Sequence, residues 1–134
     1  MASPPSVTET NREIITQFYG MLAARNFAGV QALFDEDIEI HEPACLPYGG
    51  VYRGIAGAQK LFGKVPQYID ISTFRIEAIV ADGDRVIGLF DGTILRTGVR
   101  VAIAEESLIR DGKIVRVRVF LFDPTLVTNV ATAT

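Results

Sequence analysis

The sequence predicts one α+β domain whose N-terminal helices pack on one face of a mainly antiparallel sheet. Its 134 residues are the length of a single domain. Apolar residues recur at helical spacing in the first half, whereas residues 72–122 alternate between apolar and polar side chains and are divided by glycine turns. Helices grouped before strands are typical of the α+β class, so one domain spanning residues 1–134 is expected.

The first helix is expected to begin at Thr8 or Thr10. Thr10 and Glu13 have the spacing of a capping box, in which each side chain accepts a hydrogen bond from the other residue's backbone N–H. Apolar residues then follow at helical spacing: Ile14, Ile15, Phe18 and Leu22. Residues 1–7 and the tail Thr128–Thr134 are expected to be loose.

Two further helices and a short strand are expected next. Asn26 begins the second helix, because asparagine is favoured at N-caps. Residues 38–41 alternate as a strand that Pro43 ends, since proline lacks the N–H that a sheet ladder needs. Residues 54–65 form the third helix, which Pro66 terminates.

The second half of the chain predicts four strands in series. Asp-Gly and Thr-Gly pairs separate them, and such pairs are typical of hairpin turns. The expected strands are 72–81, 85–96, 99–110 and 113–122. Hairpins in series make an antiparallel meander.

Alternation along the last two strands predicts which side chains face the helices. On the last strand the purely apolar set belongs inside, namely Val115, Val117, Val119 and Leu121. On the preceding strand, the set with Arg100 and Arg110 at its ends belongs outside, which turns Glu105 and Ser107 inward. A carboxylate on an apolar face is costly to ionise. In the opposite register Glu105 would be solvated or paired with an arginine, and this alternative stays open.

The outward sets of these strands carry more apolar surface than a monomer usually exposes. They include Ala102, Ala104, Leu108, Phe120 and Phe122. We therefore expect a homodimer formed through the outer face of the sheet.

Composition excludes several classes of function. A net charge of -3 without a basic cluster argues against nucleic-acid binding. No apolar run approaches the ~20 residues of a membrane span, and the polar start lacks a signal-peptide core, so no membrane contact and a cytoplasmic location are expected. One cysteine, Cys45, and one histidine, His41, cannot make a zinc site. No phosphate-binding motif follows Gly49, Gly50 or Gly54, so neither a metal nor a cofactor is expected.

Four segments taken together resemble the nuclear transport factor 2-like superfamily, in its SnoaL-like polyketide cyclase and ketosteroid isomerase branches. They read FYGMLAARNFAGVQALF, DIEIHEP, LPYGGVYRG and IRDGKIVRVRVFLFD, and they extend over nearly the whole chain. The resemblance implies a strongly curved sheet forming a cone-shaped barrel, a deep apolar pocket and frequent homodimers. The residues expected to line the pocket are Phe18, Tyr19, Leu22, Phe34, Tyr48, Tyr52, Phe62, Phe90, Ser107, Val117, Val119 and Leu121.

The resemblance also implies roles for two carboxyl groups. Glu42, followed by proline, falls where ketosteroid isomerases have the aspartate that acts as general base. Glu105 falls on the acid that stays protonated and donates to the developing oxyanion in those enzymes. The departure lies on the first helix, where Phe18 replaces the oxyanion tyrosine, so Tyr19 or Tyr48 would have to substitute.

The same comparison with limonene epoxide hydrolase disfavours epoxide hydrolysis. Phe90 and Val119 stand at positions of its catalytic Asp-Arg-Asp set.

The sequence therefore supports three hypotheses about function. The first is an isomerase or cyclase that needs no cofactor and acts on an apolar carbonyl compound, steroid- or polyketide-like, with Glu42 and Glu105 as catalytic residues. The second is a non-catalytic pocket for an apolar small molecule, and the third is an interaction domain that uses its outer sheet. An ordinary structural role for Glu42, near Arg53, also stays open.

Overall fold

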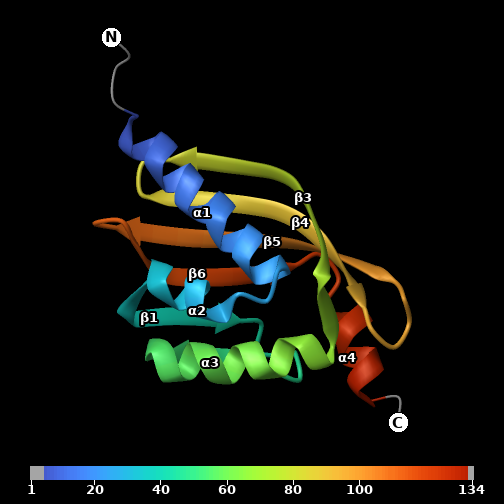
Figure 1. The fold of residues 1–134 in the computed structure, drawn as a ribbon. Coiled ribbons are helices and arrows are strands. Elements are labelled where there is room, and N and C mark those ends of the chain that lie inside the picture. The colour runs from blue at the N-terminus through green and yellow to red at the C-terminus, as the bar shows by residue number, and fades with distance from the viewer. Residues whose placement is uncertain (1–4, 133–134) are drawn as a thin grey trace.

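The computed structural model describes residues 5–132 and shows the first three helices packed on one face of a six-stranded sheet (Figure 1). The helices are α1 (Val7–Ala23), α2 (Phe27–Leu33), α3 (Gly54–Lys64) and α4 (Thr125–Thr132), and a 3-10 turn, Val65–Gln67, follows α3. The strands are β1 (Phe34–Glu42), β2 (Gly50–Arg53), β3 (Ile69–Asp82), β4 (Arg85–Ile94), β5 (Arg100–Arg110) and β6 (Lys113–Leu121). The α+β class is confirmed.

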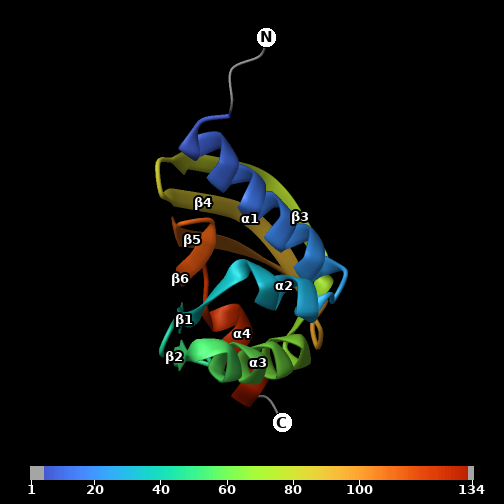
Figure 2. The same cartoon turned by 60° about the vertical axis from the view of Figure 1, so that its left-hand side comes forward.

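The sheet has the order β2-β1-β6-β5-β4-β3. Strands β3 to β6 form the expected antiparallel meander, and β1 joins β6 in parallel. Figures 1 and 2 show the sheet curving strongly around α1, α2 and α3, which lie on its concave face. The sheet does not close into a barrel, because β2 and β3 remain at its two edges, so the shape is that of an open cone.

Both ends of the described chain are more ordered than the sequence suggested. Ser6, not Thr10, caps α1, since its hydroxyl accepts from the Glu9 N–H at 3.1 Å. The tail expected to be loose from Thr128 is instead helical as far as Thr132. The Asp123 side chain accepts from the first N–H of that helix at 3.1 Å. Residues 1–4 and 133–134 of the expected loose ends lie outside the described part.

The first strand is longer than expected and has a partner that the sequence did not reveal. Strand β1 reaches back to Phe34, and the four-residue β2 pairs with it antiparallel, with Ile40 opposite Tyr52. Strand β2 lies in a segment rich in glycine and proline and is too short for alternation to stand out. The pairing places Gly50 opposite Glu42, so the loop between the two strands begins and ends at the same end of β1.

The predicted alternation holds on β5 and breaks at one point on β6. Glu105 and Ser107 are buried on the inner face of the sheet, as the arginines at the strand ends indicated. On β6, Leu108 pairs with Arg116 but Ile109 pairs with Ile114, so the ladder skips one residue. This irregularity buries Ile114 and leaves Val115, expected inside, only partly buried.

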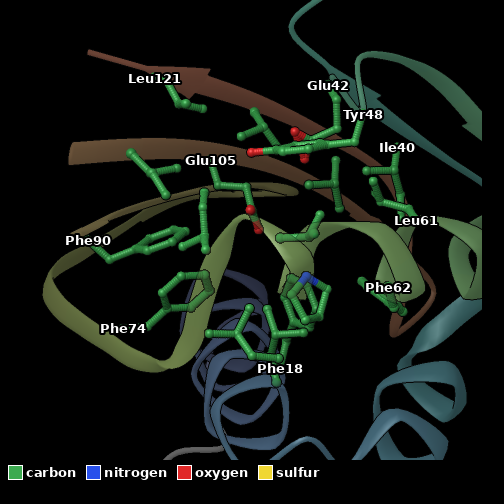
Figure 3. Close-up of a pocket in the computed structure, with 18 of the residues that line it drawn as sticks. Phe18, Ile40, Glu42, Tyr48, Leu61, Phe62, Phe74, Phe90, Glu105 and Leu121 are labelled. Atoms are coloured by element: carbon green, nitrogen blue, oxygen red, sulfur yellow. The ribbon is translucent and has the colours of Figure 1, made fainter. Parts of the chain in front are cut away.

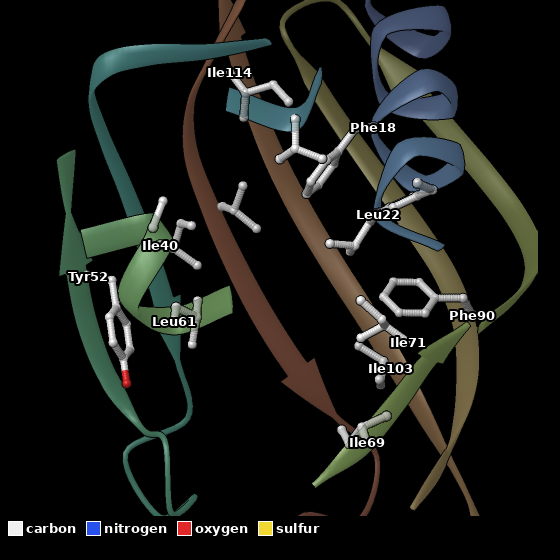
Figure 4. Packing of buried hydrophobic residues seen from close by; sticks show 14 of the residues in the cluster. Phe18, Leu22, Ile40, Tyr52, Leu61, Ile69, Ile71, Phe90, Ile103 and Ile114 are labelled. Carbon is white, nitrogen blue, oxygen red and sulfur yellow. The ribbon is translucent and has the colours of Figure 1, made fainter. Parts of the chain in front are cut away.

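The core fills the space between the helices and the concave face. Figure 4 shows Phe18 and Leu22 of α1 and Leu61 of α3 directed toward the strands. No helix among the described residues is long and apolar enough to cross a membrane.

Candidate functional site

A cavity lies between the helices and the concave face of the sheet (Figure 3). The space between its lining atoms, counted together with the part that is open to solvent, is about 630 Å³. Its lining is apolar except for Glu42, Tyr48 and Glu105. The other lining residues are Phe18, Leu22, Phe27, Ile40, Leu61, Phe62, Val65, Pro66, Ile69, Ile71, Phe74, Phe90, Ile103, Val117, Val119 and Leu121.

Most residues expected at the pocket do line the cavity. They are Phe18, Leu22, Glu42, Tyr48, Phe62, Phe90, Glu105, Val117, Val119 and Leu121. Four others are buried behind its wall: Tyr19, Phe34, Tyr52 and Ser107. Phe34, for example, packs edge-on against Phe18 at 5.7 Å.

The start of β3 supplies lining residues that the sequence analysis missed. The strand was expected from residue 72, but it begins at Ile69, and Ile69, Ile71 and Phe74 reach the cavity. The alternation of Ile69 and Ile71 with polar neighbours would have revealed them, because it continues the pattern of the strand backwards.

Strand pairing brings the two carboxyl groups to the same cavity. Glu42 ends β1, and Glu105 lies in the middle of β5. Strand β6 runs between them, with Val117 beside Ile40 and Val119 beside Glu105. The carboxyls thus face the cavity from the two sides of β6.

The Glu42 side chain ends in a buried, unpartnered oxygen. The residue is only partly buried as a whole, but its Oε2 atom is buried and has no hydrogen-bond partner among the described residues. Burial raises the pKa of Glu42 well above its ordinary value, and the charge of Glu105 raises it further. Arg53, which follows Glu42 closely in the sequence, pairs with Glu39 on the outer face and not with Glu42.

Glu105 is more deeply buried, with 8% of the residue exposed. Burial raises the pKa of Glu105 from about 4.5 to about 8. Interaction with the Tyr19 hydroxyl opposes this shift. The two groups are close enough to interact, although neither Tyr19 Oη nor Glu105 Oε1 has a hydrogen bond of good geometry to a described residue. At neutral pH Glu105 is therefore mainly the neutral acid.

Tyr48 is the third polar group of the cavity. Figure 3 shows its ring beside the Glu42 carboxyl. Burial, and next the charge of Glu42, raise the pKa of Tyr48, so the phenol stays protonated. The Tyr52 hydroxyl donates to the Tyr48 carbonyl at 2.8 Å, which fixes the loop that carries Tyr48. Of the two tyrosines considered as oxyanion donors, Tyr48 lines the cavity and Tyr19 does not.

The described residues that line the cavity include no lysine, arginine or histidine. The arginines of the central strands lie on the outer face, where Arg116 and Arg118 both donate to Glu106. His41 is also outside the cavity and contacts Glu39 at 3.1 Å. Among the described residues, no three His, Cys, Asp or Glu side chains are grouped as metal ligands would be. The cavity offers a ligand apolar contact, two carboxyls and one phenol.

Comparison with known proteins agrees with this fold. The profile of the SnoaL-like domain matches residues 15–117. No curated protein matches the chain. The structure is similar to Bal32a from a soil-derived mobile gene cassette, with a TM-score of 0.79 and 23% identity, covering 90% of this chain and 95% of the other.

Two further solved structures are similar. An NTF2-like protein from Burkholderia thailandensis has a TM-score of 0.76 and 28% identity, with 91% of this chain and 96% of the other covered. A Kribbella flavida protein provisionally named a ketosteroid isomerase has a TM-score of 0.74 and 20% identity, with 87% of this chain and 80% of the other covered. The chain therefore belongs to the SnoaL-like domain family, within the nuclear transport factor 2-like superfamily that its sequence resembles.

Proposed function

We propose that the cavity binds a small, mainly apolar carbonyl compound, steroid- or polyketide-like in its rings, and that Glu42 and Glu105 transfer protons on it without a cofactor. The observation that carries this proposal is the pair of unpartnered carboxyls in an otherwise apolar cavity. Buried carboxyls with no cation to neutralise them destabilise a fold, so their presence favours a role in chemistry.

Burial raises the pKa of both carboxyls, so charge does not divide their roles; the resemblance assigns Glu42 as the base and Glu105 as the acid. Glu105, with its pKa raised to about 8, is a hydrogen-bond donor at neutral pH and stabilises the oxyanion of an enolate. Glu42, in its ionised form, takes the proton from the carbon next to the carbonyl. The electron pair of that C–H bond forms the C=C bond of the enolate, and the π pair of the carbonyl moves to the oxygen. Return of the proton to another carbon completes an isomerisation and restores the Glu42 carboxylate. Tyr48, also a neutral donor, lines the same cavity, which supports a role as the second hydrogen-bond donor to the oxyanion.

Proton exchange on a bound enone tests this proposal. A bicyclic enone in D₂O should exchange its acidic hydrogens in the presence of the protein, as followed by NMR. Glu42→Gln should abolish exchange, because the amide is not a base. Glu105→Gln should keep binding and slow exchange, since a neutral amide is a weaker donor to an oxyanion.

Glu106→Gln is the matched control, because it changes the next residue of β5 on the outer face. Exchange at the original rate in both cavity variants would refute the acid-base roles.

A second candidate function is a carrier of an apolar ligand in which the carboxyls only orient that ligand. The replacement of the family's oxyanion tyrosine by Phe18 favours this alternative. The same experiment separates the two functions. A carrier binds the enone without exchange, and its affinity still depends on Glu42 and Glu105.

A second copy of the chain is the proposed partner. On the outer face, Ala78, Leu89, Ala104 and Phe120 form one apolar row across four strands. Phe120 is 51% exposed and Phe122, close by, is 90% exposed, which is costly in water. Sedimentation at micromolar concentration should give about twice the chain mass, and Phe120→Asp should give the monomer. A wild-type protein that sediments as the 14.6 kDa species would refute the dimer.

A further inference from the structure

Gly88 on β4 is in close contact with Tyr19 of α1. A Cβ atom at position 88 would lie 2.2 Å from the Tyr19 hydroxyl oxygen and 2.6 Å from the ring carbon that carries it. The backbone of Gly88 does not have a positive φ, so the conformation does not require glycine. The close approach of the Tyr19 phenol does require glycine, because any other side chain at position 88 would displace the phenol.

The position of Gly88 places that phenol next to Glu105. Gly88 and Glu105 are direct partners in the β4–β5 ladder, and both face the inside of the sheet. Side chains of direct partners lie about 5 Å apart, and the glycine leaves its half of that space empty. The Tyr19 hydroxyl occupies the empty half.

Tyr19 reaches Glu105 from behind the cavity wall. Tyr19 is buried and does not line the cavity, whereas Glu105 does. Its ring packs against the rings of Phe18 and Phe90, with ring centroids 5.3 Å and 5.1 Å away. Tyr19 Oη and Glu105 Oε1 are both buried, and neither has a hydrogen-bond partner among the described residues. Two buried polar atoms without other partners are strongly favoured to bond to each other.

We propose that Tyr19 is a positioning residue whose hydroxyl holds Oε1 of Glu105 from behind, so that the second oxygen and its proton point into the cavity, and that Gly88 makes this contact possible. The hydroxyl donates to Oε1 and the acid donates through its other oxygen. A freely rotating acid could direct its proton toward Tyr19 instead of a ligand.

This arrangement explains how a tyrosine one position after Phe18 can serve the site without entering it. Tyr19 acts through Glu105, whereas Phe18 leaves the cavity surface apolar. The consequence for catalysis rests on the proposed function, but the contact itself can be tested on the free protein. Because the hydroxyl favours the charged form of Glu105, its removal should raise the pKa of that acid.

The experiment is a ¹³C NMR titration of protein labelled at the glutamate carboxyl carbons, with the Glu105 resonance assigned from Glu105→Gln. In Tyr19→Phe the titration midpoint of Glu105 should rise by roughly one pH unit, the effect of losing one hydrogen bond to a carboxylate. Tyr52→Phe is the control, because it also removes a buried tyrosine hydroxyl, one that bonds to the Tyr48 carbonyl. It should leave the midpoint unchanged.

A glycine pair on β4 supplies the second test. Gly88→Ala should displace Tyr19 and raise the same midpoint, whereas Gly92→Ala, whose Cβ meets Phe74 at 2.7 Å, should not. An unchanged midpoint in folded Tyr19→Phe overturns the proposal, as does an equal rise in Gly88→Ala and Gly92→Ala. If Gly88→Ala does not fold, Tyr19→Phe alone decides. Failure of the proposed function would appear separately, as a wild-type protein that exchanges no enone protons.

Discussion

Replacing Glu105 by glutamine should remove a loss of stability that the wild-type protein suffers as the pH rises. Glu105 is buried with a pKa near 8, whereas the same group in the unfolded chain titrates near 4.5. Below about pH 4.5 both states hold the proton, so the contribution of Glu105 to stability is fully present. Above that pH the unfolded chain ionises while the folded protein does not. The free energy of unfolding therefore falls until about pH 8 and then levels off.

The magnitude follows from the difference between the two pKa values of Glu105. It is about 3.5 pH units, which at 1.36 kcal/mol per unit corresponds to about 5 kcal/mol. Water that reaches the cavity side of the carboxyl reduces this value. The pKa of Glu42 is also raised, so ionisation of Glu42 lowers the free energy of unfolding as well, and this part of the fall remains in Glu105→Gln. Asp91 and Glu106 have lowered pKa values, so their contributions to the free energy of unfolding change at lower pH than the contribution of Glu105 does.

Urea unfolding at intervals between about pH 5 and about pH 9 measures this effect directly. The wild-type free energy of unfolding should fall across the range, and the fall should be smaller in Glu105→Gln. The control Glu106→Gln should keep the fall, because Glu106 is held ionised by Arg118 on the outer face. A Glu105→Gln variant whose stability falls as steeply as that of the wild type would refute the burial of an uncompensated carboxyl.

Three other substitutions test separate parts of the structure. Phe18→Tyr adds a hydroxyl to the cavity wall and should increase the rate of enone exchange, measured by NMR, if an oxyanion donor is limiting. Ser107→Ala should be neutral or slightly stabilising in urea unfolding, because the buried Ser107 hydroxyl has no partner among the described residues. Asn11→Ala should lower the free energy of unfolding by about 1 kcal/mol or more, because Asn11 donates to the Gly83 carbonyl at 2.9 Å and ties α1 to the β3–β4 turn.

Those parts of the fold that depend on neighbouring residues could be predicted from the sequence. The hairpins follow from glycine turns, and the inward direction of Glu105 follows from the arginines at both ends of its strand. The cap of α1 was misplaced because Thr10 and Ser6 both have a glutamate three residues later, and sequence alone does not choose between them.

Pairings between distant segments could not be predicted in the same way. The parallel contact of β1 with β6 joins Ile40 to Val117, and nothing in either segment specifies the other. The skipping of Val115 depends on how β5 and β6 pair, so the sequence of neither strand predicts it alone. The position of Tyr19 depends on the absence of a side chain at Gly88. In the sequence alone, this glycine indicates only a weakened strand.

Glu105 and Glu106 show how strand register sets the chemistry of this protein. They are adjacent on β5, so their side chains point to opposite faces. Glu106 meets Arg116 and Arg118, which hold its pKa low and keep it charged. Glu105 meets Val119 and Gly88, which offer no charge, and it stays protonated. A shift of one residue would exchange these environments, so the register that builds the core also decides which glutamate is the acid.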